Sequence, residues 1–281
     1  MTIHVSPVRR NLNFHLPKER ISRWNGGGPH FTQFLNALSV FFPEGERFFI
    51  QSVRNYRDQV TDKKLQEDVR GFIAQEAFHG REHEEYNEAL QEAGFPVDRY
   101  EGIVTNLLET VKKYTRKDAQ LGVTVALEHL TAILANTLLK HPELLENSDE
   151  NFSLIWQWHA LEETEHKAVA FDVYKQVVGS GVYSYLLRTT TFVLANVIFV
   201  SLLTPFYLDI IRRDKQLTNM KGWGKAFQYL WGRPGAIRKV IPDWLDYFKP
   251  GFHPWDHDNR EYLKSAEALE SFVLNLTPIE A

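Results

Sequence analysis

Residues 158–170 carry acidic and imidazole side chains at spacings that could hold a metal ion. His159, Glu163 and His166 stand at i, i+4 and i+7, and at about 100° per residue their side chains fall within roughly 60° of one another on a helix. Imidazole nitrogen and carboxylate oxygen together suit iron, manganese or zinc. This segment therefore predicts a helix with one metal-binding face.

The arrangement recurs earlier in the chain. Glu76, His79 and His83 stand at i, i+3 and i+7 and also share one helix face. Two single glutamates, Glu46 and Glu128, lie inside apolar helical runs that precede the two segments. The order is Glu, then Glu-x-x-His, then Glu, then His-x-x-x-Glu-x-x-His.

Carboxylates and imidazoles on core-facing stripes need a compensating charge. Gathering four glutamates in an apolar interior costs several kcal/mol per uncompensated ion through desolvation and like-charge repulsion. Two divalent cations would remove that cost, because four carboxylates balance four positive charges. The pattern therefore favours a two-metal centre over four isolated buried acids.

The elements that must position these residues read as helices. Glu46 and Glu76 are 30 residues apart and Glu128 and Glu163 are 35 apart, so each pair fits one helical hairpin of a bundle. No strand alternation is present, and the predicted fold class is all-α: a four-helix bundle with additional C-terminal helices. The expected helices are Phe31–Val60, with Pro43 as a kink or as the true start; Asp62 or Lys63 to Ala93; Ile103–Tyr114; Lys117–Lys140; and a helix capped by Asn147 or Ser148 that ends near Gly179.

Breakers and composition shifts divide the chain into three parts. Residues 1–28 form an extended arm that ends in a Gly-Gly-Gly-Pro run. Residues 29–180 form the di-metal bundle. Residues 181–281 supply an apolar helix and a basic, aromatic C-terminal region packed on that bundle.

The apolar stretch Val182–Ile211 has the length of a membrane span, since 189–208 holds 20 residues without a charge. Residues 212–250 then carry nine Lys or Arg against three Asp, a net +6. A single span would place this basic segment and the metal bundle on opposite sides of a membrane. Three alternatives stay open: a buried or interface-lying helix, a homodimer or partner surface, and a true span. Peripheral contact with an anionic membrane is compatible with the first.

Composition excludes several classes of site and partner. The 281-residue chain has no cysteine, so disulfides, Fe–S clusters and thiol nucleophiles are excluded. A net charge of −4 with 24% charged residues argues against a disordered chain and against a nucleic-acid partner. The first 20 residues lack the apolar run of a secretory signal, which predicts a cytoplasmic location, with membrane association open.

As a set, the ligand pattern resembles the ferritin-like di-iron carboxylate superfamily, in which two helices each give a Glu and two others each give Glu-x-x-His. His159 ahead of Glu163 also resembles the arylamine N-oxygenases, where a third histidine joins the set. The segments QEAFHGREH and WHALEETEHKAVAFDVY are similar to a bacterial family described as predicted metal-dependent hydrolases. The resemblance covers about residues 40–178.

The resemblance implies two iron ions, with manganese or zinc possible, and O₂ as co-substrate. Glu76 and either Glu128 or Glu163 are candidates for bridging, and His83 is an eighth ligand or a partner behind the ligands. Glu44, His129, Glu162 and Glu165 neighbour ligands but point about 100° away, and the last two are expected to be solvated. The implied ligands are Glu46, Glu76, His79, Glu128, His159, Glu163 and His166.

Three functions are compatible with such a site. The first is an O₂-activating di-iron oxidoreductase that oxygenates or oxidises a hydrophobic small molecule near Ala132, Ala135, Phe49 and Phe72, and draws electrons from an external donor. The second is a hydrolase in which the two ions activate a water. The third is a non-catalytic iron-binding or membrane-associated protein.

Overall fold

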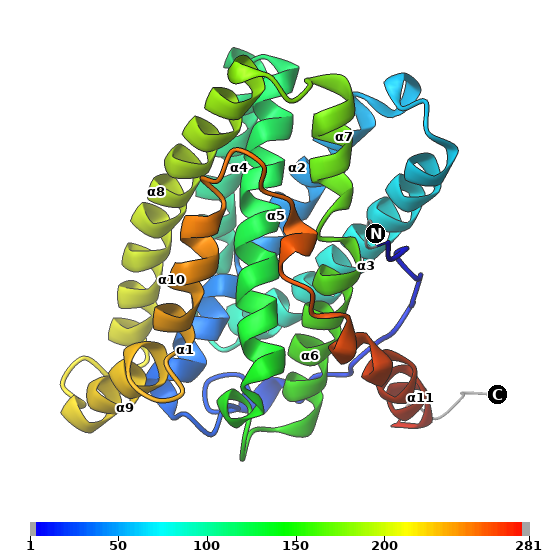
Figure 1. The fold of residues 1–281 in the computed structure, drawn as a ribbon. Coiled ribbons are helices and arrows are strands. Elements are labelled where there is room, and N and C mark those ends of the chain that lie inside the picture. Colours follow the sequence, from blue (N-terminus) through cyan, green and yellow to red (C-terminus); the bar gives the residue numbers. More distant parts are fainter. Residues whose placement is uncertain (1–3, 277–281) are drawn as a thin grey trace.

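The computed structural model describes residues 4–276, and these form eleven α-helices and no strand (Figure 1). The predicted all-α fold is confirmed. The helices are α1 (Pro29–Ser39), α2 (Phe42–Arg54), α3 (Lys63–Glu92), α4 (Val97–Tyr114), α5 (Lys117–Lys140), α6 (Glu150–His166), α7 (Val169–Val177), α8 (Val182–Arg213), α9 (Met220–Trp231), α10 (Ala236–Asp246) and α11 (Ala266–Leu276).

The four helices that carry the predicted ligands pack against one another. Helix α2 contacts α3 and α5, while α6 contacts α5 and α3. Helix α8 covers the outer side of α5, and α10 packs on α5 beside it (Figure 1). The ligand-bearing faces therefore meet inside a bundle, with α8, α9 and α10 on one flank and α11 on the other side against α6.

Local signals explain most helix ends. The Asp62 side chain accepts a hydrogen bond from the Leu65 N–H at 2.7 Å and caps α3. Gly94, at φ 91°, follows the end of α3 in the left-handed conformation that commonly terminates helices. The bounds of α5 are those expected from the sequence.

Several predicted helices differ in the structure. The helix expected over Phe31–Val60 is two helices, and Pro43 lies in the first turn of α2, where its missing N–H costs nothing. Pro43 therefore marks a start and not a kink. Helix α4 begins earlier than Ile103, at Val97, directly after Pro96.

The helix that carries His159 also has different ends. Its N-cap is Asp149, whose side chain accepts from the Asn151 N–H, and not Asn147 or Ser148. Ser148 instead accepts from the Gly26 N–H at 3.0 Å. The helix ends at His166, and α7 is a separate element.

The N-terminal arm crosses the gap between α3 and α6 (Figure 1). The Gln75 side chain of α3 donates to the Val8 carbonyl at 2.9 Å, and the Val8 N–H donates to Glu165 of α6 at 3.0 Å. A Cβ at Gly71 would lie 2.8 Å from the Pro7 carbonyl oxygen, so glycine allows the arm to approach α3. The arm thus covers the bundle interior on this side.

Two helices in residues 4–276 are long and apolar enough to cross a membrane: α5 and α8. The apolar window of α5 is 61% buried inside the protein and that of α8 is 33% buried. Helix α5 is therefore a core helix, whereas α8 buries only its inner side.

Candidate metal centre

All eight predicted site residues are buried. Their exposed fractions lie between 0 and 4%, and they come from α2, α3, α5 and α6. The residues are Glu46, Glu76, His79, His83, Glu128, His159, Glu163 and His166.

Seven of the eight form three overlapping groups whose ligand atoms lie within 4.8 Å of one another. The groups share Glu76 and His79, so they form one continuous centre. They are Glu46, His79 and His159; Glu76, His79 and Glu163; and Glu76, Glu128 and His166.

The Glu163 carboxylate lies between the histidines. Its Oε1 is 3.1 Å from His159 Nε2, 3.3 Å from His166 Nε2 and 3.9 Å from His79 Nδ1. His166 Nε2 also lies 3.1 Å from Glu76 Oε1. Glu163 therefore lies close both to His159 on one side of the centre and to His166 and Glu76 on the other.

The donor set fits two cations. Both carboxylate oxygens of Glu46, Glu76 and Glu128 are buried without a hydrogen-bond partner. His79 Nδ1 and His166 Nε2 are likewise buried without a hydrogen-bond partner. Buried polar atoms normally find partners, and divalent ions would supply them to this whole set at once.

The pKa shifts of the buried carboxylates also indicate that this centre needs positive charge. Burial, followed by repulsion from Glu163 and Glu46, raises the pKa of Glu128 well above its usual value. Burial and neighbouring carboxylates likewise raise the pKa of Glu76. Burial also acts on Glu163, but His166 and His159, when they are protonated in the metal-free protein, outweigh it and hold the Glu163 pKa well below the usual value. The negative charges therefore need an external counter-charge.

Two imidazoles are fixed from behind by hydrogen bonds. The amide N–H₂ of Gln75 donates to the Val8 carbonyl and to Glu165, so Gln75 Oε1 accepts from His166 Nδ1–H at 2.9 Å. His79 Nε2–H donates to Glu162 at 3.1 Å. Each histidine thereby turns its unprotonated nitrogen toward the centre, as metal-ligating histidines usually do.

A third relay fixes His159. The Asn87 amide donates to Glu101, and its oxygen accepts from the Ser39 hydroxyl at 2.8 Å. Ser39 then accepts from His83 Nδ1–H at 2.9 Å, and His83 Nε2 accepts from His159 Nδ1–H at 2.8 Å. The lone pair of His159 Nε2 consequently faces the centre.

The structure places His83 behind His159. Both of its ring nitrogens have partners, Ser39 and His159, and His83 belongs to none of the three groups found in residues 4–276. Of the two roles open to it from the sequence, this geometry favours the partner behind the ligands.

The expectation that Glu162 and Glu165 are solvated is wrong. Their exposed fractions are 0% and 4%. Arg10 forms a two-pronged ion pair with Glu165 at 2.7 and 2.9 Å and reaches Glu162 at 3.3 Å. Burial still raises the pKa of Glu162 to about 8. The helix face that carries these two glutamates packs beneath the arm, which sequence periodicity does not reveal.

Two other near neighbours of the ligands lie outside the centre. Glu44 pairs with Arg47 on the surface. His129 is buried, but its Nε2 hydrogen-bonds the Asp243 carbonyl at 3.2 Å.

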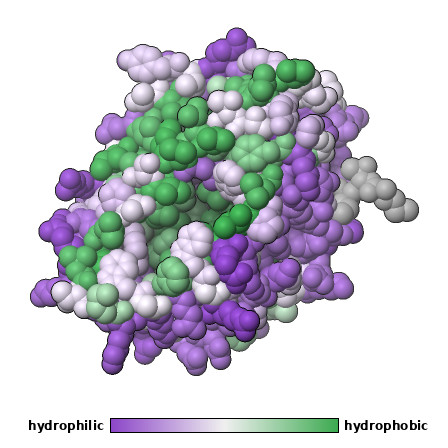
Figure 2. All heavy atoms as spheres, turned by 60° about the vertical axis from the view of Figure 1, so that its left-hand side comes forward, coloured by the Kyte–Doolittle hydropathy of each residue, from purple (hydrophilic) through white to green (hydrophobic). Residues whose placement is uncertain are grey.

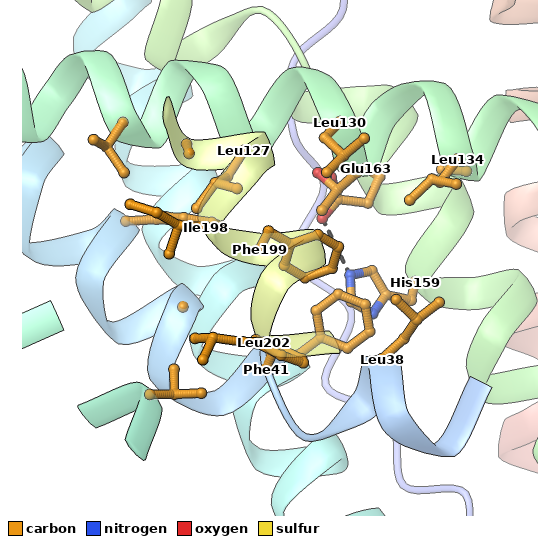
Figure 3. Close-up of a pocket in the computed structure, with 18 of the residues that line it drawn as sticks. Leu38, Phe41, Leu127, Leu130, Leu134, His159, Glu163, Ile198, Phe199 and Leu202 are labelled. Atoms are coloured by element: carbon orange, nitrogen blue, oxygen red, sulfur yellow. Dashed lines mark hydrogen bonds and ion pairs between the residues drawn. The ribbon is translucent and has the colours of Figure 1, made fainter. Parts of the chain in front are cut away.

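A large apolar cavity adjoins the centre. It has a volume of about 510 Å³, and His159 and Glu163 form part of its wall. Figure 3 shows these two side chains among leucine and phenylalanine side chains from α1, α5 and α8. Of the residues expected beside a substrate, Ala135 and Phe49 line this cavity and Ala132 and Phe72 do not.

Comparison with protein families gives one finding. A family model described as "predicted metal-dependent hydrolase" matches residues 8–258. No curated protein and no solved structure matches the chain.

Proposed function

The chain belongs to the family of predicted metal-dependent hydrolases, and on that premise we propose that it is a two-metal enzyme that acts on a hydrophobic, chain-like molecule. We propose further that the reaction is an O₂-dependent oxidation. The observation that carries the proposal is that the apolar cavity reaches His159 and Glu163 of the metal centre.

In this proposal the metal ligands are the seven residues of the three groups. Two iron ions would supply O₂ activation when bound. Glu46, His79 and His159 would hold one ion, and Glu76, Glu128 and His166 would hold the other, since each set is one of the close groups. Glu163 would help to hold the pair, because its Oε1 lies within 3.3 Å of both His159 Nε2 and His166 Nε2.

The shape of the cavity supports an elongated substrate. Its wall follows α8 from Leu187 to Leu202, which is about 22 Å at 1.5 Å per residue. A cavity of about 510 Å³ that extends along the helix in this way and has an apolar wall suits a hydrocarbon chain.

The chemistry of the wall favours oxidation. Beyond the metal ions themselves, a hydrolase usually has polar groups that orient the ester or amide and its developing oxyanion. Apart from His159 and Glu163, the polar side chains of the wall are threonines and Trp156. A wall of this kind would hold an unreactive hydrocarbon segment and exclude water. Electrons would come from an external donor.

Hydrolysis is the second candidate, and the family description favours it. Two divalent ions lower the pKa of a bound water and direct it at an acyl or phosphoryl centre. In that case the same cavity would hold the apolar part of an ester or amide, with the scissile bond beside Glu163.

One experiment separates the two reactions. Protein loaded anaerobically with two Fe(II) per chain is exposed to O₂ while oxygen uptake and the visible spectrum are followed. Oxidation predicts stoichiometric uptake and a transient band in wild type and in Glu44→Gln, and loss of both in His166→Gln. Metal-dependent cleavage of long-chain esters without O₂ uptake would instead assign the hydrolase. If the metal-loaded protein shows neither O₂ uptake nor ester cleavage, the enzyme proposal is refuted.

A further inference from the structure

The outward side of α8 is apolar over most of its length, with exposed Thr190, Ser201 and Thr204 among the apolar side chains. Five residues define it, and we name it the α8 stripe: Leu186, Val193, Val197, Val200 and Leu208. Their exposed fractions are 41–58%, and on a helix they fall within about 80° of one another. The stripe runs for about 33 Å at 1.5 Å per residue.

Surface apolar residues that occur singly need no explanation, whereas a contiguous patch marks an interaction site. The part of α8 between Thr189 and Leu208 contains no charged residue. Figure 2 shows hydrophobic side chains gathered over this face of the molecule, around a hollow.

The cavity and this face share residues. Leu194 and Ile198 are 55% and 40% exposed, and both also line the cavity. The surface beside the stripe is therefore continuous with the wall that leads to the metal centre.

Basic residues lie at both ends of α8. At its start, the Tyr183 hydroxyl donates to Asp118 at 2.8 Å. The exposed Lys117 is therefore nearby, together with Arg116, which pairs with Asp118 at 3.0 Å. After its end, residues 215–241 hold six Lys or Arg and no acidic residue. The whole chain nevertheless has a net charge of −4, so positive charge is concentrated in the segment that follows α8.

Helix α9 adds large side chains to the basic end. Met220, Phe227 and Trp231 are 75%, 66% and 44% exposed. Aromatic and basic residues that flank an apolar helix face are typical of helices that lie in a membrane interface.

We propose that the α8 stripe, with the basic residues at its two ends, docks on the surface of an anionic lipid bilayer. Anionic headgroups would neutralise both basic ends, since polybasic segments are attracted to such surfaces. A second copy of this chain would instead bring like-charged ends together in either orientation.

Docking leaves α8 lying on the bilayer and not across it. The inner side of α8 packs on α5 and α1. The buried Arg188 guanidinium donates to the Lys249 carbonyl at 3.1 Å, and Asn196 accepts from the Trp244 indole at 3.1 Å. Surrounding α8 with lipid would break these contacts, whereas contact through the stripe alone keeps them.

One consequence rests on the proposed function. A hydrocarbon substrate dissolved in the bilayer would enter the cavity beside Leu194 and Ile198 without crossing water. Bilayer docking itself is tested without turnover, so its failure and the failure of the enzyme proposal are distinguishable.

The test is flotation of the full-length chain with vesicles of phosphatidylcholine alone and with 30% phosphatidylglycerol, across a range of salt concentrations. Wild type is expected to float with the anionic vesicles and less so as salt rises. The double variant Val193→Asp/Val197→Asp should lose at least tenfold in affinity, while the control Leu274→Asp, at an exposed leucine of α11, keeps it. Lys215→Glu/Lys221→Glu should reduce binding to anionic vesicles, unlike Lys175→Glu/Lys264→Glu.

Circular dichroism and metal content confirm that each variant is folded. Absence of wild-type flotation at every composition overturns the proposal, as does equal binding by the stripe variant. A wild-type dimer that Val197→Asp converts to a monomer also overturns it, because a second copy would then cover the stripe.

Discussion

Individual side chains in the metal centre are set by partners that lie outside it. His79, His159 and His166 each use one ring nitrogen for a hydrogen bond away from the centre. The partner fixes which nitrogen carries the proton, and metal affinity depends on that choice. Residues that never contact a metal should therefore affect metal binding.

Glu128 tests the charge balance of the centre. We expect Glu128→Gln to bind fewer than two metal ions per chain by elemental analysis. We also expect the metal-free variant to be more stable than wild type at pH 7, by about 3 kcal/mol or less, because a raised pKa costs about 1.4 kcal/mol per unit only until it reaches the pH of the measurement. The amide removes a buried carboxylate that Glu163 and Glu46 repel. Glu44→Gln, two residues from Glu46, is the control for both measurements. Full metal content in Glu128→Gln would remove this residue from the ligand set.

Ser39 tests the relay behind His159. In Ser39→Ala, His83 Nδ1–H loses its acceptor, so the proton of His159 is no longer held on Nδ1. Metal affinity measured by competition with a chelator should fall about 10–100-fold. Ser52→Ala is the matched control, because Ser52 is also buried but bonds Thr124. Equal losses in the two variants would show a packing effect and not a relay.

The ligand faces could be predicted from the sequence because their spacing is local. His159, Glu163 and His166 lie within one helix, and helical periodicity alone places them together. The roles of Glu162 and Arg10 could not be predicted, since their contact joins residues 152 apart in the chain. Helical periodicity shows that Glu162 points away from the ligands, but not that the arm covers it.

At the scale of elements, ion pairs of Arg10 attach the N-terminal arm to the helices of the bundle. Arg10 is 5% exposed and lies against Glu162 and Glu165. Its guanidinium also comes within 3.5 Å of Glu270 in α11. One arginine therefore connects the arm to two helices.

Removing Arg10 should destabilise the folded protein. We expect Arg10→Ala to lower the free energy of unfolding by about 3–5 kcal/mol, because the buried Glu165 carboxylate loses its counter-charge and Glu162 loses a hydrogen-bond donor. Denaturant titration measures this, with the exposed neighbour variant Arg9→Ala expected to stay within about 0.5 kcal/mol of wild type. If Arg10→Ala changes the free energy of unfolding only slightly, the arm is held mainly by its backbone contacts.

Helix α8 is attached to α4 through Asp209, which accepts from the Tyr100 hydroxyl at 2.7 Å and from Arg213 at 2.8 Å. Partial burial opposes ionisation, but the bonds from Arg213, Tyr100 and Arg212 outweigh it and lower the Asp209 pKa. A lowered folded-state pKa gives stability that is present above the unfolded value of about 3.9 and lost as pH falls below it.

The stability difference between wild type and Asp209→Asn should therefore be about 1 kcal/mol or less near pH 7, since the carboxylate is partly exposed. It should shrink as pH falls below about 4. Urea titrations at several pH values check this. A difference that is constant with pH would indicate lost hydrogen bonds and not lost charge.

Helix bounds were predicted well where a pattern and a breaker coincide. Helix α5 runs unbroken between its expected ends, and α3 ends one residue before the expected Ala93. The division between α6 and α7 could not be predicted, because Lys167 lies within a continuous helical pattern. There its ammonium donates to the His257 carbonyl at 2.7 Å, a contact supplied by the distant C-terminal region.

At the scale of the whole molecule, metal binding and folding should be linked. The proposed ligands come from four helices, and ions that bind only the folded chain stabilise it by mass action. We expect Tm to rise on addition of Fe(II) or Mn(II), corresponding to about 4 kcal/mol at a thousandfold excess over Kd. The variant Glu46→Gln/His166→Gln should show no rise, while Glu44→Gln/His141→Gln should behave as wild type. An equal rise in the two variants would place the bound metal elsewhere.

The contact between Arg10 and Glu165 also sets an order of events during synthesis. The two residues are 155 positions apart, and at about 5–20 residues per second the ribosome needs roughly 10–30 s to make that length. The first segment to leave the ribosome therefore cannot complete this contact until α6 has followed it. Until it does, the side of the bundle between α3 and α6 lies open, and that interval is when ions from the surrounding solution have their shortest route to the nascent ligands.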